Sequence, residues 1–409
     1  MNNIKSLAQR YGKTLALCAV AAAIGAVTGV CTTVFGKVLN FVDAVRVDNF
    51  YLLIPFLAPV GAIISFFYKK YGKAANKGMK LIFKFGQDGE DAQDSVIPVR
   101  LIPLSVAATW LTNLFGGSSG REGVAVQIGA TISSFFGRFI KIDDRKKLFV
   151  IIGMSAGFAG LFQTPLAAVF FAIEVLTVGA LEYKALLPAA IASLSATATS
   201  RLLGLEHFKY DLDYHPELTV SFLFKIAVLG LIFAVVGGIF AFLLKNVKSL
   251  LENKIANPVL RTFLIGALIS ILMVLLHSGR YSGVGANIIK AAFGGAEIYP
   301  YDWILKLLLT VITLAAGFQG GEVTPLFTIG TALGFVIAPA FGLPLDFVAA
   351  LGYVAVFCSG TNTFLAPILV GAEIFGYQNA PYFIAVCMIS FIFNGNKSIY
   401  AQKRMKSLD

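Results

Sequence analysis

Long stretches without a single charged side chain dominate this sequence and determine what it can fold into. About 20 apolar residues cross the hydrocarbon core of a bilayer as a helix, and many of these stretches approach or exceed that length. The pattern therefore predicts a membrane protein with many helices. The charge-free stretches are 14–36, 51–68, 101–120, 148–173, 185–200, 226–244, 262–279, 307–321, 323–345, 347–372 and 374–396.

The composition agrees with a membrane protein and excludes several other classes. Of 409 residues, 57% are hydrophobic and only 13% are charged, which excludes a soluble globular domain, a disordered chain and a disulfide-rich secreted protein. No segment alternates apolar and polar residues over ten positions, as the strands of a transmembrane barrel do. We predict a single all-α polytopic membrane domain over residues 1–409.

The basic residues flank the apolar stretches. A net charge of +11 would suggest nucleic acid in a soluble chain, but flanking Lys and Arg residues are topology signals. We therefore expect no nucleic-acid partner, and we place both termini in the cytoplasm. Residues 1–36 are read as a retained helix because the first stretch exceeds a normal signal-peptide core. The terminal basic residues are Lys5, Arg10, Lys13, Lys397, Lys403, Arg404 and Lys406.

Glycine and proline interrupt the apolar sequence at matching places in two halves. Unwound backbone at membrane depth survives only where it is buried or lines a hydrated cavity. Glu122 and Glu322 follow these breaks and lie 200 residues apart, which is typical of an internally repeated transporter with its site near the midplane. We expect repeat halves at 14–200 and 226–405. The breaks contain Gly116, Gly117 and Gly120, then Gly317, Gly320, Gly321 and Pro325.

Glu122 is the first candidate functional residue. A glycine-rich segment that opens a helix presents free backbone N–H groups, and the helix dipole adds positive charge there. A carboxylate that occupies such an anion site, or leaves it when protonated, is a gate that couples anions to protons. The alternative is a structural pair of Arg121 and Glu122, but we favour the gate because intramembrane carboxylates are costly and usually functional.

Three segments resemble the CLC family of anion channels and anion/proton antiporters. Gly120-Arg121-Glu122-Gly123 is similar to its first anion-binding segment, Gly320-Gly321-Glu322-Val323-Thr324-Pro325 to its second, and Ser398-Ile399-Tyr400 to the tyrosine near its last membrane helix. The resemblance spans about 15 to 405. It implies the CLC fold of two inverted-topology halves with tilted and broken helices, a homodimer with one pathway per subunit, and an inner-gate role for Tyr400.

Departures from the chloride pattern resemble the fluoride/proton antiporter branch of the family. Met79 replaces the serine that donates a hydrogen bond to the central anion in chloride members, and the usual Ile-Phe pair is replaced by Glu322 and Val323, followed by Thr324. Fluoride can share a proton with a carboxylate because HF is a weak acid much like a carboxylic acid. A second pathway carboxylate therefore suits fluoride and would repel chloride.

Each of these residues also has a structural interpretation. Glu322 could form a salt bridge with Lys290 or Lys306, Thr324 could cap a helix, Tyr400 could lie in an aromatic belt, and Met79 could fill a helix surface. Two further buried acids, Glu174 and Glu373, are read as structural and helix-bonded.

The sequence therefore predicts a secondary active transporter that exports fluoride in exchange for protons, as a multi-pass protein of a bacterial plasma membrane. The anion pathway is assigned to Met79, Gly120, Arg121, Gly123, Gly321, Glu322, Val323, Thr324 and Tyr400, with Glu122 as the proton-coupling gate. The alternatives are a chloride-selective CLC antiporter or passive channel and, remotely, an intramembrane enzyme. Histidines and cysteines lack ligand spacing, so we expect no metal, cofactor or catalytic residue.

Overall fold

The computed structural model describes residues 2–89, 97–140, 142, 144–217 and 219–404, and these residues are predominantly helical. Lys406, one of the predicted flanking charges, lies outside the described residues. Five helices of the described part are long and apolar enough to cross a bilayer: Thr14–Asp48, Phe50–Asp88 counted as one continuous segment, Val220–Lys254, Pro258–Leu275 and Val323–Phe341. Several other apolar helices are shorter than a bilayer crossing requires.

The helices fall into two successive sets. The first set comprises α1 (Asn2–Asp48), α2 (Phe50–Leu53), α3 (Leu57–Phe67), α4 (Met79–Asp88), α5 (Leu101–Leu114), α6 (Glu122–Gly137), α7 (Arg145–Phe162), α8 (Pro165–Glu174) and α9 (Leu186–Leu202). The second comprises α10 (Val220–Lys254), α11 (Pro258–Leu275), α12 (Ala286–Phe293), α13 (Asp302–Ala316), α14 (Val323–Phe341), α15 (Leu345–Thr361), α16 (Leu365–Phe375) and α17 (Ala380–Ile392).

Short turns and one strand pair complete the described elements. The turns are η1 (Ile54–Phe56), η2 (Tyr68–Gly72), η3 (Lys73–Lys77), η5 (Tyr183–Ala185), η6 (His277–Gly279) and η7 (Tyr377–Asn379). Strand β1 (Thr177–Val178) pairs in parallel with β2 (Lys403–Arg404), which brings the end of the described chain beside the end of α8.

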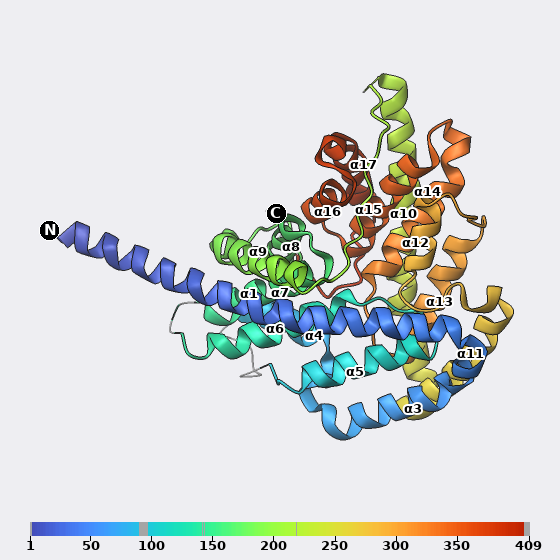
Figure 1. Ribbon diagram of the computed structural model, residues 1–409, viewed down its shortest axis with the longest axis horizontal. Coiled ribbons are helices and arrows are strands. Elements are labelled where there is room, and N and C mark those ends of the chain that lie inside the picture. Colours follow the sequence, from blue (N-terminus) through green and yellow to red (C-terminus); the bar gives the residue numbers. More distant parts are fainter. Residues whose placement is uncertain (1, 90–96, 141, 143, 218, 405–409) are drawn as a thin grey trace.

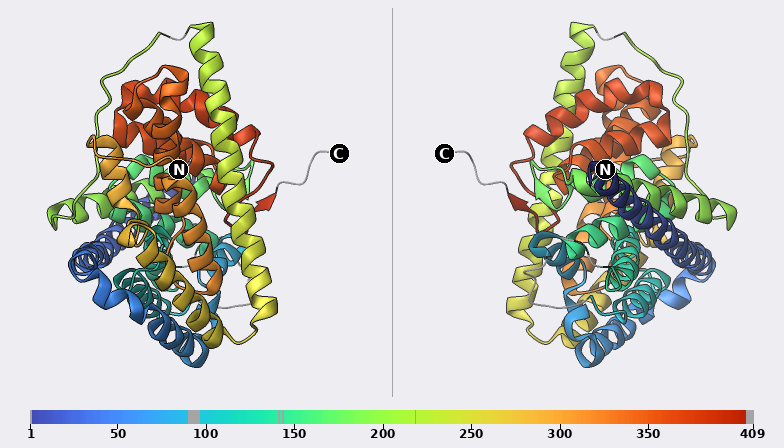
Figure 2. Two further views of the ribbon diagram at one scale, coloured as in Figure 1. Left: turned by 90° about the vertical axis from the view of Figure 1, so that its right-hand side faces the viewer. Right: turned by 90° about the vertical axis from the view of Figure 1, so that its left-hand side faces the viewer.

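The two sets occupy different sides of the molecule. Figure 1 shows most of the blue-to-green helices grouped beside the orange-to-red ones, with α3 beside α11 at the lower end. Figure 2 shows α10 running along most of the height of the molecule. Corresponding helices recur about 200 residues apart, since α6 begins at Glu122 and α14 at Val323, while α8 begins at Pro165 and α16 at Leu365.

The same close helix packing occurs in both sets. A methyl group built on Gly129 of α6 would collide with the carbonyl oxygen of Gly153 in α7, and one built on Gly330 of α14 would collide with that of Gly352 in α15. Small residues allow helix backbones to approach closely in a membrane, where packing drives association. In each half, the helix that follows the glycine-rich break therefore packs tightly against the next helix: α6 against α7, and α14 against α15.

Glu174 and Glu373 cap each other's helices. The Glu174 carboxylate at the end of α8 accepts hydrogen bonds from the first backbone N–H groups of α16, from Phe364, Leu365 (3.1 Å) and Ala366 (3.2 Å). In return, Glu373 in α16 accepts from Leu166 (3.0 Å) and Ala167 (2.9 Å) at the start of α8. The reciprocal arrangement is what two inverted halves produce, and the helix-bonded interpretation of both acids agrees with it.

Removing the Glu174 cap is expected to destabilise the fold. Glu174→Ala leaves three half-buried N–H groups without a partner, at a cost on the order of 3 kcal/mol, whereas Glu373→Ala releases two N–H groups and should cost less. Thermal unfolding in detergent checks the order. A Glu174→Ala protein that melts with the wild type, or later than Glu373→Ala, would contradict the proposed capping role.

Candidate functional site

Two glycine-rich loops meet at the centre of the molecule and deliver two helix starts to one place. The loop at 115–121 leads into α6, and the loop at 317–322 leads into α14. They pair through two backbone hydrogen bonds, from Gly120 N to Gly321 O at 2.6 Å and from Gly321 N to Gly120 O at 2.8 Å. Free N–H groups at both helix starts therefore face a shared space, which is an arrangement that attracts anions.

The Glu122 carboxylate occupies this shared space. Its side chain is 1% exposed, and Oε2 accepts a hydrogen bond from the backbone N–H of Arg121 at 3.1 Å. The backbone N–H groups of Glu122 itself and of Thr324, from the start of α14, also face the carboxylate. Oε1 is buried without a hydrogen-bond partner among the described residues. The Glu122 carboxylate thus lies between the two helix starts, where an anion would bind.

Glycine is required where the carboxylate lies. A methyl group built on Gly321 would collide with Glu122 Oε2 and would lie 3.0 Å from Gly123 N. One built on Gly120 would lie 2.5 Å from the same carboxylate oxygen and 2.8 Å from Pro325 Cδ. The glycines therefore keep this space open to a small group.

Met79 and Glu322 approach the same place from the other side. A methyl group built on Gly123 would lie 3.6 Å from Met79 Cγ, 3.7 Å from Gly321 Cα and 3.9 Å from Glu322 Oε2. Met79 is the first residue of α4 and is half-buried, after Gly78 with a φ of 49°. Three helix starts, those of α4, α6 and α14, therefore converge around Gly123.

Glu322 precedes α14 as its N-cap residue. The charged groups that act on it are Glu122 and Lys248 of α10. The alternative of a salt bridge to Lys290 or Lys306 is not seen in the described part of the chain, because the Lys306 ammonium binds three other groups and Lys290 lines a cavity. Glu322 therefore faces the first acid across the glycine pair without a salt-bridge partner among the described residues.

Thr324 and Arg121 also have definite positions. Thr324 is the second residue of α14, and its Oγ1 is buried without a partner in the described structure, so the side chain does not cap the helix. The Arg121 guanidinium contacts Asn40 Oδ1 at 3.5 Å and lies 5.9 Å from the Phe162 ring. Only its backbone N–H is hydrogen-bonded to Glu122. Val323, which lies between Glu322 and Thr324 in the sequence, is the first residue of α14 and is buried.

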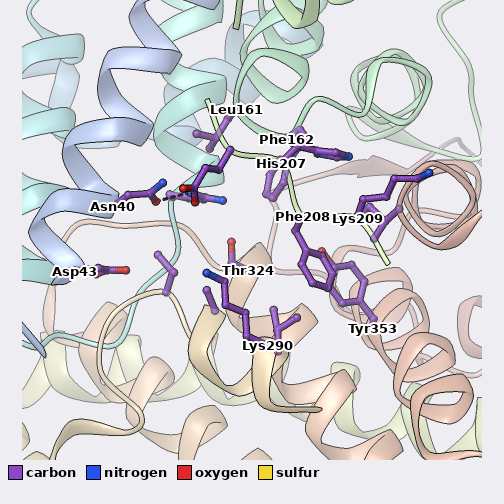
Figure 3. A pocket seen from close by; sticks show the side chains of 16 residues that line it. Asn40, Asp43, Leu161, Phe162, His207, Phe208, Lys209, Lys290, Thr324 and Tyr353 are labelled. Atoms are coloured by element: carbon purple, nitrogen blue, oxygen red, sulfur yellow. Dashed lines mark hydrogen bonds between the residues drawn. The ribbon is translucent and has the colours of Figure 1, made fainter. Parts of the chain in front are cut away.

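A cavity of about 400 Å³ opens beside Thr324. Figure 3 shows Thr324 between Asn40, Lys290, Phe208 and Tyr353. This space, which we call the Thr324 cavity, is lined by Asn40, Asp43, Arg121, Leu161, Phe162, Glu206, His207, Phe208, Lys209, Val284, Ala286, Ile289, Lys290, Thr324, Tyr353 and Ile374.

The Thr324 cavity carries an excess of permanent positive charge. His207 lies in the segment between α9 and α10, where its Nδ1 donates to Phe162 O at 2.8 Å. Burial lowers the pKa of His207 below its ordinary value. Its ring is therefore neutral at neutral pH. The three cations of the lining, Arg121, Lys209 and Lys290, outnumber its two carboxylates, Asp43 and Glu206, by one, and this excess favours an anion.

Tyr400 lies at a second cavity of about 450 Å³. Its ring stacks on Phe83 of α4 at 5.0 Å and meets Phe171 edge-on at 6.0 Å, so it packs in an interior aromatic cluster and not in a lipid-facing belt. The residues of this Tyr400 cavity are Val178, Ala241, Phe242, Lys245, Asn246, Asn362, Gly395, Asn396, Lys397, Ser398, Tyr400, Ala401 and Gln402. Lys245 and Lys397 make it basic as well.

Three residues near the site were not identified from the sequence as functional candidates, although Lys306 was considered as a salt-bridge partner of Glu322. Lys306 is fully buried but borders the apolar stretch 307–321, where it looks like a flanking charge. Tyr353 stacks on Phe327 with ring centroids 4.0 Å apart, and nothing distinguishes it from other aromatics in stretch 347–372. Lys248 lies on α10, among several lysines after stretch 226–244. Lys306 could have been found from the sequence by asking which charged residues fall inside a predicted helix and not at its end.

Two basic cavities on either side of an acidic, glycine-lined helix junction define a class of protein: a membrane ion-transport protein built from two inverted halves. The model of the voltage gated chloride channel family matches residues 60–395. The chain therefore belongs to the CLC family.

Individual relatives agree with this family. A crystal structure described as a CLC-type fluoride/proton antiporter is 47% identical, with a TM-score of 0.94, and the match covers 97% of this chain and 99% of that one. A chloride/fluoride channel protein of Pseudomonas syringae pv. tomato is 34% identical over 358 residues, 85% of this chain and 78% of the relative. The H⁺/Cl⁻ exchange transporter ClcA of Klebsiella pneumoniae is 25% identical over 446 residues, 99% of this chain and 92% of the relative.

Proposed function

We propose that this protein is a secondary active transporter, and not an enzyme, that exchanges fluoride for protons and so exports fluoride. The observation that carries the proposal is the Glu122 carboxylate, which lies between two helix starts beside a second acid, Glu322. The match to a structure described as a CLC-type fluoride/proton antiporter supports the choice of substrate. Such an activity confers fluoride resistance.

Glu122 is the residue that links the two substrates. As a carboxylate it fills the anion position at the starts of α6 and α14. When protonated it loses its attraction for the N–H groups and leaves that position to an anion. Fluoride then takes the place of the carboxylate, so the uptake of a proton by Glu122 is coupled to the movement of the anion in the opposite direction.

Glu322 and Thr324 receive fluoride next to this position. Thr324 Oγ1 is a buried hydroxyl without a hydrogen-bond partner among the described residues, so it can donate a hydrogen bond to the anion. Glu322 can hold fluoride only through a proton, because two negative charges repel each other. Chloride is the anion of a strong acid and cannot share that proton, which gives a physical reason for selectivity.

The remaining pathway residues line the route between the cavities. Met79, Gly120, Arg121, Gly123, Gly321 and Val323 surround the junction, and Tyr400 guards the inner mouth. This assignment makes the Tyr400 cavity cytoplasmic and the Thr324 cavity external. We also propose that the protein lies in the plasma membrane of a bacterial cell, with both termini in the cytoplasm.

The proposed assembly is the one that the resemblance to the family implies. We assign two repeat halves, 14–200 and 226–405, and a homodimer with a complete pathway in each subunit.

A passive channel is the second candidate function, favoured by the description of the Pseudomonas relative as a channel protein.

Reconstituted protein in liposomes tests the function. We expect fluoride efflux at least tenfold faster than chloride efflux at neutral pH, and a pH gradient should drive fluoride against its own gradient. Protein-free liposomes control for HF permeation through lipid. Equal rates for the two anions contradict the fluoride assignment, and a pH gradient that moves no fluoride indicates a channel.

A further inference from the structure

Lys306 is a lysine in the interior of the membrane domain that the proposed pathway does not use. It lies in α13 and is 0% exposed. Burying an ammonium group away from water costs several kcal/mol unless other groups compensate it, and ionisable residues within membrane segments are usually functional. Its environment should therefore reveal what compensates the charge.

The hydrogen-bond partners of Lys306 come from two loops. Its Nζ donates to Ser118 Oγ at 2.9 Å, to Tyr281 O at 3.1 Å and to Gly283 O at 2.8 Å. Ser118 belongs to the loop that leads into Glu122, and the other two precede α12. No carboxylate is among these partners, so the three bonds satisfy the N–H groups without neutralising the charge.

The two loops also bind each other at this point. Gly283 N donates to Gly117 O at 2.9 Å, and Ser119 N donates to Gly283 O at 3.2 Å. Gly283 O therefore accepts from both Lys306 and Ser119. The ammonium therefore holds the loop in place at Ser118, four residues before Glu122.

Glu122 is the acid left to balance this charge. Three charged groups act on Lys306: Arg46, Asp43 and Glu122. Asp43 already pairs with Arg46 at 2.6 Å, so these two largely cancel. The remaining pair is Lys306 and Glu122, one buried cation and one buried anion linked by the same loop.

We propose that Lys306 is a positioning residue for anion transport: its ammonium fastens the loop behind Glu122 and supplies a positive charge that Glu122 and the transported anion balance in turn. This inference rests on the proposed function. When Glu122 is protonated, the positive charge is uncompensated and an anion is attracted to replace it. The lysine thereby favours anion entry at the moment that Glu122 takes up a proton.

Two neutral variants separate the charge from the hydrogen bonds. Lys306→Met removes both, whereas Lys306→Gln removes the charge and keeps N–H donors. We expect the KM for fluoride to rise at least tenfold in both, with kcat changed less than threefold. Lys184→Met is the matched control, because that lysine is exposed and pairs with Asp144, which is also exposed. The KM of this variant should stay within twofold of wild type.

The outcomes decide between charge, packing and failure of the proposed function. A wild-type KM in Lys306→Gln overturns the charge role, since hydrogen bonding alone would then suffice. A wild-type KM in Lys306→Met overturns it as well, since neither the charge nor the hydrogen bonds would then be needed. A fall in kcat with unchanged KM indicates a purely structural lysine and also overturns it. If the wild type moves chloride and not fluoride, the proposed function fails, and the same KM shift measured with chloride still tests Lys306.

A folding defect in Lys306→Met is resolved by a double variant. Removing the cation leaves the Glu122 charge uncompensated, so Lys306→Met with Glu122→Gln should recover monodisperse protein and raise the melting temperature relative to Lys306→Met alone. Recovery supports the charge balance. A double variant that is no better folded than Lys306→Met contradicts it.

Discussion

Replacing Glu122 with glutamine is expected to abolish proton coupling. Glutamine has the size of glutamate, but it does not ionise, so it can neither carry a proton nor bind the N–H groups of α6 and α14 as an anion. Proton flux linked to fluoride should fall at least 100-fold, to the leak of protein-free liposomes. Simultaneous recording of external pH and fluoride in a liposome efflux assay measures both fluxes.

Residual fluoride movement in Glu122→Gln is informative. A flux that dissipates a fluoride gradient without responding to pH is what a permanently neutral gate would allow. Glu297→Gln is the matched control, since it makes the same change at an exposed acid and should retain coupling. Proton-driven fluoride transport that persists in Glu122→Gln would show that another group carries the proton.

The helix starts around the site could be predicted from the sequence because their signal is local. Glycines before an acid, inside apolar sequence, indicate an unwound segment followed by a helix, and the structure starts α6 at Glu122 and α14 at Val323. The pairing of Gly120 with Gly321 is a contact between distant segments. No local pattern predicts such a contact, although the 200-residue spacing of the two acids hinted at it.

Two helix breaks escaped prediction because polar residues, not glycine, make them. Stretches 148–173 and 347–372 each hold two helices, divided at Gln163 and Asn362, which adopt left-handed φ values of 57° and 53°. Gln163 Nε2 donates to Leu205 O at 2.8 Å, and Asn362 Oδ1 accepts from Asn394 at 2.8 Å. Tertiary hydrogen bonds hold both breaks, so the sequence around each one reads as continuous apolar helix.

The search for charged residues inside apolar stretches identified the two acids, Glu122 and Glu322, but it did not identify Lys306 as a buried charge. Glu122 stands alone between apolar stretches, whereas Lys306 stands three residues after Trp303 and directly before stretch 307–321. Flanking lysines are normally at the water interface. Only the position of α13, with Ser118 and Gly283 packed against it, shows that this lysine lies inside the protein.

Gly321→Ala is expected to stop transport. The added methyl group would collide with Glu122 Oε2, and it would lie 2.9 Å from Glu122 N and 3.0 Å from Gly123 N. It therefore occupies the position that the carboxylate or an anion must take at the start of α6. The backbone hydrogen bonds between Gly321 and Gly120 do not involve that position and should survive.

Gly120→Ala is expected to act in the same way. A methyl group on Gly120 would lie 2.5 Å from the same Glu122 oxygen, 2.8 Å from Pro325 Cδ and 2.9 Å from Gly321 O. Both variants crowd neighbouring backbone as well as the carboxylate, so both should lower the melting temperature, and the fluoride flux of the protein that remains folded should fall at least 100-fold. Gly12→Ala, with open space around it, is the control for alanine itself. Wild-type flux in Gly321→Ala would mean that the anion and the Glu122 carboxylate do not share this position, because no carboxylate can bind there beside the methyl group.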